Sequence, residues 1–337
     1  MSDLGEFELI ARYFKRPGRP LGAGVALGVG DDCALLQPGP GMQLAVSSDM
    51  LVSGRHFFAD VDPRTLGHKA LAVNLSDLAA CGAKPLGFTL ALALPEANAD
   101  WLAAFSEGLF ALADAHGCTL VGGDTTRGPL NICITVFGEV PPGQALLRSG
   151  AQAGDDIYVS GTLGDAALAL RALQGTVDLP PGLLAQTRQR LETPTPRVAL
   201  GMALRGVASA AADVSDGLLG DLGHILQQSG KGATIYAENA IQLIAAHAHS
   251  TGPTGLFDLK IPANTLMQCA LAGGDDYELV FTAAPAQRDA VHHAAQIADV
   301  PVTCIGRITA DAGLTLLDAN GAVLPPATFS SFDHFAP

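Results

Sequence analysis

Residues 62–82, DPRTLGHKALAVNLSDLAACG, predict a helix whose two ends are marked in the sequence. Asp62 is suited to the N-cap, Pro63 to the first helical position, and Gly82 to the position after the last turn. Small and apolar residues recur at three- and four-residue spacing, and the same spacing brings Asn74 and Asp77 to one face. The helix therefore carries two polar side chains on an otherwise apolar surface.

The segments around this helix alternate between strand and helix patterns. Residues 43–48 predict a strand that delivers Asp49 at its end. Further strands are expected over residues 87–94, 118–121, 131–140, 157–160, 277–282, 302–308 and 314–317, and a short strand or extended segment over 210–214. Helices are expected over residues 99–116, 163–173, 218–228 and 287–298. Mixed strands and helices in both halves indicate an α/β fold (α+β in its mixed sheets) built from two α/β layers.

The length of 337 residues suits two domains of about 150 residues each. The segment from Pro141 to Asp155 is rich in Pro, Gly and polar residues, which is typical of a domain boundary. We therefore expect an N-terminal domain over residues 1–140 and a C-terminal domain over residues 141–337. A hydrophobic content of 48% with 15% charged residues is typical of a folded globular chain.

The charge and the cysteines restrict the possible partners and the compartment. A net charge of −14 would repel nucleic acid and anionic membranes, so a polyanionic substrate needs bridging cations. No run of about 18 apolar residues occurs, and acidic residues occupy the first positions where a secretory signal needs positive charge. The six cysteines are scattered without a CxxC pair, as in reduced cytoplasmic proteins. We expect a cytoplasmic protein without a membrane or nucleic-acid partner.

Aspartates next to Gly or Ser are the most informative feature for chemistry. Glycine allows a close backbone approach to a ligand, and carboxylates are hard oxygen donors that suit Mg²⁺. One such motif alone is more often an ordinary turn, but six in one chain indicate a phosphate site with several metal ions. The P-loop pattern and the protein-kinase motifs are absent. The motifs are Gly30-Asp31-Asp32, Ser47-Ser48-Asp49, Ser76-Asp77, Gly122-Gly123-Asp124, Asp213-Val214-Ser215-Asp216-Gly217 and Gly273-Gly274-Asp275-Asp276.

Seven stretches carry a resemblance to a known family: EFELI (6–10), GVGDDCA (28–34), KALAVNLSDLAA (69–80), GGDTTRGP (122–129), DVSDGL (213–218), GGDDYEL (273–279) and FDHF (332–335). Taken in this order, they resemble the bacterial thiamine-monophosphate kinases. These belong to a wider group of ATP-dependent enzymes with aminoimidazole ribonucleotide synthetase, selenophosphate synthetase and a hydrogenase-maturation protein.

The resemblance implies a two-domain synthetase-like fold and a set of site residues. An N-terminal mixed sheet with helices would dimerise, and a C-terminal α/β domain would complete an active-site cleft. The implied reaction is direct in-line transfer from ATP to thiamine monophosphate in a homodimer. Several Mg²⁺ ions would be held by Asp32, Ser47, Ser48, Asp49, Asp77, Asp124, Asp213 and Asp216; ATP would contact Gly123, Asp124, Arg148 and Ser215; thiamine monophosphate would contact His56, Asp275 and Phe332. Asp49, Asp124 and Arg148 would be the catalytic residues.

Two positions, Ser48 and Asp275, depart from common family usage, a third varies among relatives, and three other functions stay open. Ser48 is commonly Thr, Asp275 is often Glu, and some relatives carry Tyr at Phe332. The alternatives are another ATP-dependent member of the same group, a metal-dependent phosphohydrolase, and a nucleotide or metal sensor without turnover. Selenophosphate synthetase is disfavoured because no reactive Cys precedes the first aspartate motif.

Overall fold

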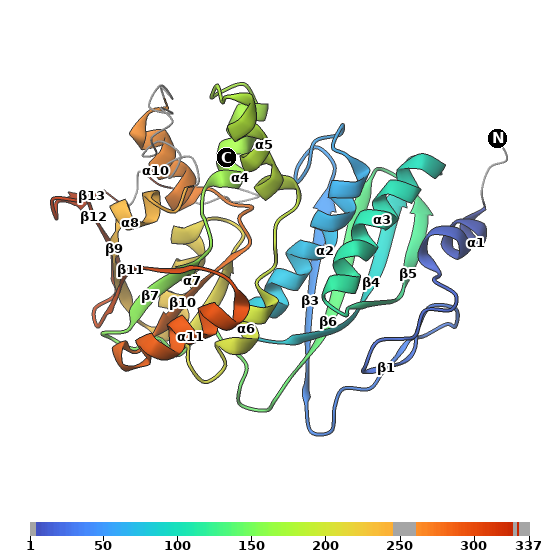
Figure 1. Cartoon of the computed structure of the whole chain (residues 1–337), viewed down its shortest axis with the longest axis horizontal. Helices are drawn as coiled ribbons and strands as arrows, with labels where there is room; N and C mark the ends of the chain where they lie inside the picture. The colour runs from blue at the N-terminus through green and yellow to red at the C-terminus, as the bar shows by residue number, and fades with distance from the viewer. Residues whose placement is uncertain (1–4, 245–260, 326–328, 330–337) are drawn as a thin grey trace. The chain divides into compact units, whose positions relative to one another are not determined.

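A computed structural model describes residues 5–244, 261–325 and 329 of the chain. The chain divides into two compact units (Figure 1). The N-terminal unit comprises Met1–Leu78 and Ala83–Ala145, and the C-terminal unit comprises Ala79–Gly82 and Leu146–Pro337. No helix in the described part of the chain has the length and apolar character needed to cross a bilayer.

The N-terminal unit is built on a mixed four-stranded sheet with the strand order β3-β6-β4-β5. Strands β4 and β5 run parallel, and the other neighbours are antiparallel. The sheet strands are β3 (Gln43–Val52), β4 (Lys84–Leu94), β5 (Thr119–Arg127) and β6 (Asn131–Val140); the short elements before them are α1 (Glu6–Leu9), the π-helix η1 (Ile10–Phe14), β1 (Val25–Leu27) and β2 (Leu35–Leu36).

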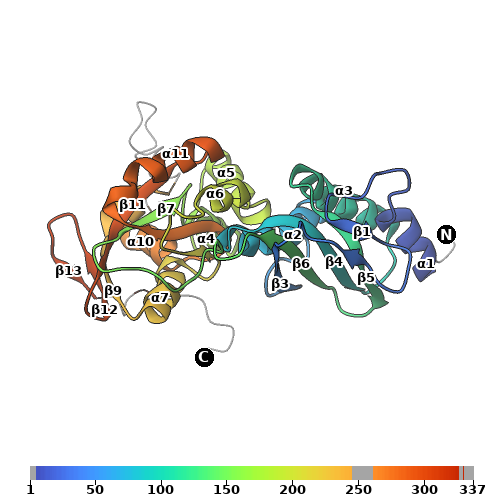
Figure 2. The same ribbon diagram turned by 90° about the horizontal axis from the view of Figure 1, so that it is seen from below.

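Helices α2 (Pro63–Ala80) and α3 (Ala99–Ala115) lie on the same side of this sheet (Figures 1 and 2). The predicted start of α2 is confirmed, because Asp62 Oδ1 accepts a 2.7 Å hydrogen bond from the Arg64 N–H. The two helices approach closely at Gly67 and Gly108, where a Cβ atom would overlap a backbone carbonyl oxygen of the other helix. Their apolar residues and one face of the sheet form the core of the unit.

The opposite face of the sheet is open along β3. Residues that face α2 are half-buried or buried, whereas Leu44, Val46, Met50 and Val52 alternate with them and are 36–56% exposed. Four large apolar side chains therefore lie along one strand and are left exposed by the described residues.

Two strand ends predicted from the sequence are wrong. Strand β3, predicted to end at Ser48, continues through Asp49 to Val52. Strand β5, predicted to end at Val121, continues through Gly122, Gly123 and Asp124 to Arg127. Both strands continue through their polar residues because a long neighbouring strand pairs with them. Strand β6 pairs with all of β3, and β4 pairs with β5 as far as Arg127. The predicted site residues Ser47, Ser48 and Asp49 thus lie within β3, and Gly123 and Asp124 lie within β5. Successive residues point to opposite faces of the sheet.

The C-terminal unit contains a seven-stranded mixed sheet with the order β13-β12-β9-β11-β7-β10-β8. Its core includes Ile157, Val159 and Val280 from the sheet, packed with Leu222 and Ile225 of α7. The strands are β7 (Asp156–Ser160), β8 (Ala210–Val214), β9 (Gly232–Tyr236), β10 (Glu278–Ala283), β11 (Val302–Thr309), β12 (Gly313–Leu317) and β13 (Val323–Leu324). The helices are α4 (Asp165–Leu173), α5 (Pro181–Glu192), α6 (Val198–Ala203), α7 (Leu218–Ser229), α8 (Ala237–Ile241), α10 (Ala263–Ala272), the 3₁₀ turn η3 (Pro285–Gln287) and α11 (Arg288–Ala298).

Candidate functional site

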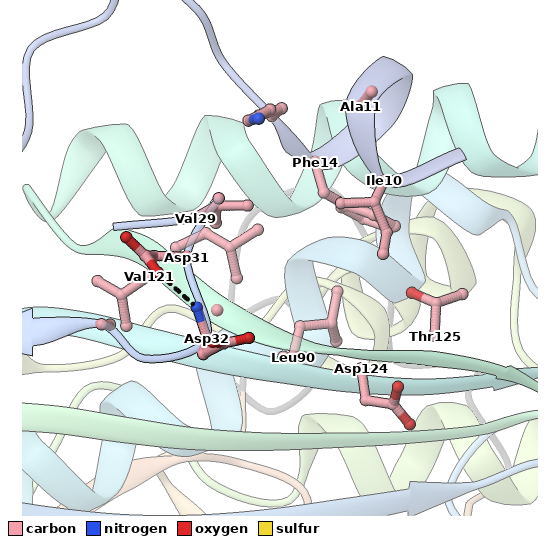
Figure 3. Close-up of a pocket in the computed structure, with 16 residues that line it drawn as sticks. Ile10, Ala11, Phe14, Val29, Asp31, Asp32, Leu90, Val121, Asp124 and Thr125 are labelled. Atoms are coloured by element: carbon pink, nitrogen blue, oxygen red, sulfur yellow. Dashed lines mark hydrogen bonds between the residues drawn. The ribbon is translucent and has the colours of Figure 1, made fainter. Parts of the chain in front are cut away.

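A cavity of about 440 Å³ in the N-terminal unit brings three of the predicted site residues together (Figure 3). It lies between the π-helix η1, the loop of residues 29–34 and strand β5. Asp32, Gly123 and Asp124 all line it, although Asp32 and Gly123 are 91 positions apart in the sequence. The Asp32 N–H donates to Asp31 Oδ1 at 3.0 Å, which shapes the loop at this wall.

The backbone conformation of β5 requires a glycine at position 123. Its φ is +147°, and a Cβ atom there would overlap the carbonyl of Leu90 on β4. Asp124 and Thr125 project to opposite sides of the strand (Figure 3). The Gly123 backbone therefore borders the cavity directly, with a carboxylate on the next residue.

A second group of predicted site residues, outside the cavity, joins β3 to α2 through polar side chains. Ser47 Oγ donates to Asp77 Oδ2 at 2.5 Å, and the Asp49 N–H donates to Asn74 Oδ1 at 3.0 Å. Asn74 also donates to the Ala70 carbonyl at 3.0 Å, which holds its amide in place. The shared helix face predicted for Asn74 and Asp77 is thus the face that meets the strand.

The two groups lie at opposite edges of the sheet. Strands β3 and β5 are three inter-strand spacings apart, or about 14 Å. Ser48 points to the other face from Ser47, since its Oγ lies 3.0 Å from Thr135 Oγ1 on β6. Among the described residues, no three Asp, Glu, His or Cys side chains are close enough to hold a metal ion together. The N-terminal unit supplies hard oxygen donors that suit Mg²⁺, but in separate subsets.

The predicted residues of the C-terminal unit meet where β8 ends and β10 begins. The Asp275 N–H donates to the Ser215 carbonyl at 2.8 Å, and the Tyr277 N–H donates to the Val214 carbonyl at 2.9 Å. These bonds connect the loops 215–217 and 273–277. The four predicted residues brought together here are Asp213, Ser215, Asp216 and Asp275.

Asp221 organises the first of these loops and was missed in the sequence analysis. Its Oδ2 accepts hydrogen bonds from the N–H groups of Ser215, Asp216 and Gly217 at 3.1, 3.1 and 3.2 Å. Burial raises the pKa of Asp221 to about 7, while the three N–H donors act in the opposite direction. An acidic residue in the first turn of a helix, directly after an Asp-Gly loop, was the available signal.

The adjacent aspartates of the GGDDY motif have different environments. Asp275 has a φ of +68° and accepts from the Tyr277 hydroxyl at 3.2 Å, whereas Asp276 is buried and accepts from the Gly164 N–H at 2.7 Å. Burial raises the pKa of Asp276 well above its ordinary value. Asp276 therefore supports the loop, and Asp275 is the member at its surface.

The remaining predicted residues lie apart from these groups. His56 is half-buried in the N-terminal unit, where its Nδ1 accepts from the Val52 N–H at 2.9 Å. Arg148 is exposed in the C-terminal unit, and its carbonyl accepts from Ser229 Oγ at 3.3 Å. Phe332 lies outside the described residues.

Comparisons with known proteins cover almost the whole chain. Residues 30–140 match the family "AIR synthase related protein, N-terminal domain", and residues 143–318 match its C-terminal domain. The chain is 47% identical to the thiamine-monophosphate kinase of Salmonella typhimurium and 45% identical to that of Escherichia coli K12, with 98% of each chain covered in both comparisons.

Solved structures agree with these relatives. A thiamine-monophosphate kinase from Stenotrophomonas maltophilia is 48% identical with a TM-score of 0.80, and the match covers 94% of this chain and 96% of that one. The structure named "AaThiL complexed with AMPPCP and TMP" is 27% identical with a TM-score of 0.73, covering 88% and 89%. The expected two-domain synthetase-like α/β fold is confirmed by these matches.

Proposed function

Because the chain belongs to the thiamine-monophosphate kinases of the AIR synthase related family, we infer that it transfers the γ-phosphate of ATP to thiamine monophosphate. The products are thiamine diphosphate and ADP, and the reaction serves thiamine biosynthesis. The observation that carries this conclusion is the match over 98% of the chain to curated kinases of this name. A related structure whose name includes an ATP analogue and TMP supports the same pair of substrates.

The metal-site residues follow the family motifs, and part of the set is also supported by its grouping within each unit. Asp32 and Asp124 border one cavity, Ser47 binds Asp77, and Asp213 lies in the strand before the 215–217 loop. All are hard oxygen donors, as Mg²⁺ requires. The set that would hold Mg²⁺ is Asp32, Ser47, Ser48, Asp49, Asp77, Asp124, Asp213 and Asp216. When bound, the ions neutralise the phosphate oxygens and orient them.

The two substrates would be held by different side chains. Gly123, Arg148 and Ser215 would contact ATP, and His56 and Asp275 would contact thiamine monophosphate, together with Phe332. The hydrogen bond from the Val52 N–H to His56 Nδ1 places the imidazole proton on Nε2, which can then donate to an acceptor phosphate.

Transfer would proceed in line, without a phosphorylated enzyme. A terminal oxygen of thiamine monophosphate attacks the γ-phosphorus, the bond from that phosphorus to the bridging oxygen breaks, and ADP leaves. The attacking phosphate is ionised near neutral pH, so a strong general base is not needed. The protein contributes positioning and charge, and Arg148 adds a permanent positive charge.

The open face of the N-terminal sheet supports a homodimer. Leu44, Val46, Met50 and Val52 form an apolar line on β3, and large exposed apolar patches mark interaction sites. A two-fold pairing through this face would cover the same patch on both copies.

Product analysis tests the proposed function. The protein is incubated with Mg²⁺, ATP and thiamine monophosphate, and thiamine diphosphate is separated by chromatography. We expect product with the monophosphate and little with unphosphorylated thiamine, which lacks the attacking phosphate. Phosphate release from ATP without any acceptor would indicate a phosphohydrolase, and tight ATP binding without turnover would indicate a sensor.

A further inference from the structure

The loop of residues 273–277 has a left-handed backbone at two residues that carry side chains. Asp275 has a φ of +68° and Tyr277 has a φ of +51°. This region favours glycine, and a bulky residue such as tyrosine is an outlier there. A strained backbone persists only where its surroundings hold it, and such strain is common at ligand sites. The residues that hold this loop therefore decide where the Asp275 carboxylate lies.

Asp276, between these two residues, is held from two sides. Its Oδ2 accepts a 2.7 Å hydrogen bond from the Gly164 N–H at the start of α4. Its backbone carbonyl accepts a 3.2 Å hydrogen bond from Arg190 Nη2 of α5. Arg190 thus binds the loop backbone at the residue that directly follows Asp275.

Glu278 keeps Arg190 in this position. The Glu278 side chain is fully buried, and its Oε1 accepts a 2.6 Å hydrogen bond from the same Arg190 Nη2. Arg197 donates to both carboxylate oxygens at 2.6 and 2.5 Å, and Ser160 Oγ donates to Oε2 at 2.6 Å. A buried carboxylate is costly only when it loses its partners, and Arg197 still pairs with Glu278 when Arg190 is replaced. Substitution of Arg190 therefore removes a contact to the loop and leaves the buried charge paired.

The loop of residues 215–217, predicted to contact ATP, has a support of its own. Asp221 Oδ2 accepts the three backbone N–H groups of this loop. Loss of the Arg190 side chain leaves these three hydrogen bonds in place. The nucleotide and the acceptor therefore depend on different side chains, Asp221 for the first loop and Arg190 for the second.

We propose that Arg190 is a positioning residue for the acceptor, because it holds the Asp276 carbonyl and so fixes the Asp275 carboxylate at the thiamine monophosphate site. The role of Asp275 rests on the proposed function. The thiazolium ring of thiamine monophosphate is cationic, and its attraction to a carboxylate falls with distance and with the entry of water. Arg190 increases the affinity for the acceptor in this way without contacting it.

Calorimetry with two ligands tests the assignment. Binding of thiamine monophosphate and of the Mg²⁺ complex of AMPPCP, an ATP analogue, is measured for each variant. Arg190→Gln should weaken thiamine monophosphate about tenfold and change AMPPCP by less than about twofold, because a charge-assisted hydrogen bond to the loop is lost. Arg190→Lys keeps the charge without the planar fork and should weaken thiamine monophosphate about threefold. Arg188→Gln removes a more exposed arginine of the same helix, paired with Glu192 at 2.7 Å, and is the matched control that should change neither ligand.

A double-mutant cycle shows whether Arg190 acts through Asp275. Asp275→Asn removes the charge but keeps a side chain that tolerates the left-handed backbone, and it should weaken thiamine monophosphate about tenfold. If Arg190 acts through this carboxylate, the double variant should bind at most about threefold more weakly than either single variant. A loss of about 100-fold, the product of the two single losses, would show that Arg190 acts independently of Asp275 and would contradict the proposal.

Two further results would overturn the assignment. Wild-type affinity for thiamine monophosphate in folded Arg190→Gln would remove the arginine from the acceptor site. Equal weakening of both ligands would give Arg190 a general role in stability instead of a role in acceptor binding. If Arg190→Gln does not fold, Arg190→Lys carries the test, and unchanged binding of thiamine monophosphate in that variant would contradict the proposal.

These measurements do not depend on turnover. An active kinase whose affinity for thiamine monophosphate is independent of Arg190 would contradict this inference and leave the proposed function intact. The expected binding pattern in a protein that makes no thiamine diphosphate would contradict the proposed function alone. A wild-type protein that binds no thiamine monophosphate would overturn both.

Discussion

Replacement of Asp221 tests whether one buried carboxylate shapes the 215–217 loop. Its Oδ2 accepts three backbone N–H groups, and this loop bears two predicted ligands, Ser215 and Asp216. Asp221→Ala removes the common acceptor and leaves the buried Gly217 N–H without it. The half-buried N–H groups of the other two residues can be rehydrated. The variant should therefore be both less stable and less able to bind nucleotide.

The size of the effect follows from the number of bonds lost. One hydrogen bond contributes about 0.5–1.5 kcal/mol, and an unsatisfied buried donor costs about 1–3 kcal/mol, so the total loss is about 3 kcal/mol. For a domain of this size, 1 kcal/mol changes the thermal midpoint by about 2–4 °C, which predicts a decrease of about 6–12 °C. Asp221→Asn keeps one acceptor oxygen and should lose about half as much.

Scanning calorimetry measures the stability, and steady-state kinetics at a temperature where all variants are folded measures the activity. kcat/KM for ATP should decrease at least about tenfold in Asp221→Ala, because the loop no longer holds its ligands. Asp289→Asn changes an exposed acidic residue in the first turn of α11 and should behave as wild type. A normal midpoint and normal ATP kinetics in Asp221→Ala would refute the reasoning.

Three further predictions concern the metal set, the dimer and pH. Asp49→Asn and Asp124→Asn should each lower kcat by about 100-fold or more with an unchanged circular dichroism spectrum, because each removes a charged oxygen donor; near-normal turnover in both would contradict the metal assignment. Met50→Asp places a charge on the open sheet face and should convert the proposed dimer to a monomer in sedimentation, whereas a monomeric wild type would reject the dimer itself. Hydrogen bonding from Arg288 lowers the pKa of Asp156, so this carboxylate stabilises the fold above about pH 4 and loses its effect as pH falls through the lowered value; thermal scans of Asp156→Asn should show a midpoint deficit at pH 7 that shrinks in acid, and an equal deficit at every pH would contradict the linkage.

The sequence predicted elements well where caps or apolar periodicity were strong. The helix from Pro63 starts at the predicted residue because Asp62 and Pro63 are specific to helix starts. The strand Asn131–Val140 has the predicted bounds, since apolar residues recur along its whole length, and the short segment Ala210–Val214 is a strand with the expected bounds. Strand β3 was ended too early, at Ser48, because the polar run Ser47-Ser48-Asp49 is typical of a strand end, although β6 pairs with β3 as far as Val52.

Other elements had no clear signal in a single sequence. Helix α5 (PGLLAQTRQRLE) is largely polar, and β9 (GATIY) is a five-residue segment that depends on pairing with two distant strands. Both elements are stabilised by contacts with residues distant in the sequence, which the local sequence pattern does not predict. They were therefore missed.

The same limit applies to the candidate site. The pairing of Asn74 and Asp77 on one helix face follows from helical spacing, and the structure confirms that this face meets β3. The separation of Asp49 from Asp124 follows from the strand order, which a single sequence does not reveal. Asp221 was missed because its role depends on the path of a loop around it.

The fate of the γ-phosphate tests the central claim most directly. The protein is incubated with Mg²⁺, thiamine monophosphate and ATP labelled in the γ-phosphate, and the label is followed in the separated products. The kinase reaction predicts that the label appears in the terminal phosphate of thiamine diphosphate, in amounts equal to the ADP formed. Label found only in orthophosphate, with no labelled thiamine diphosphate, would contradict it.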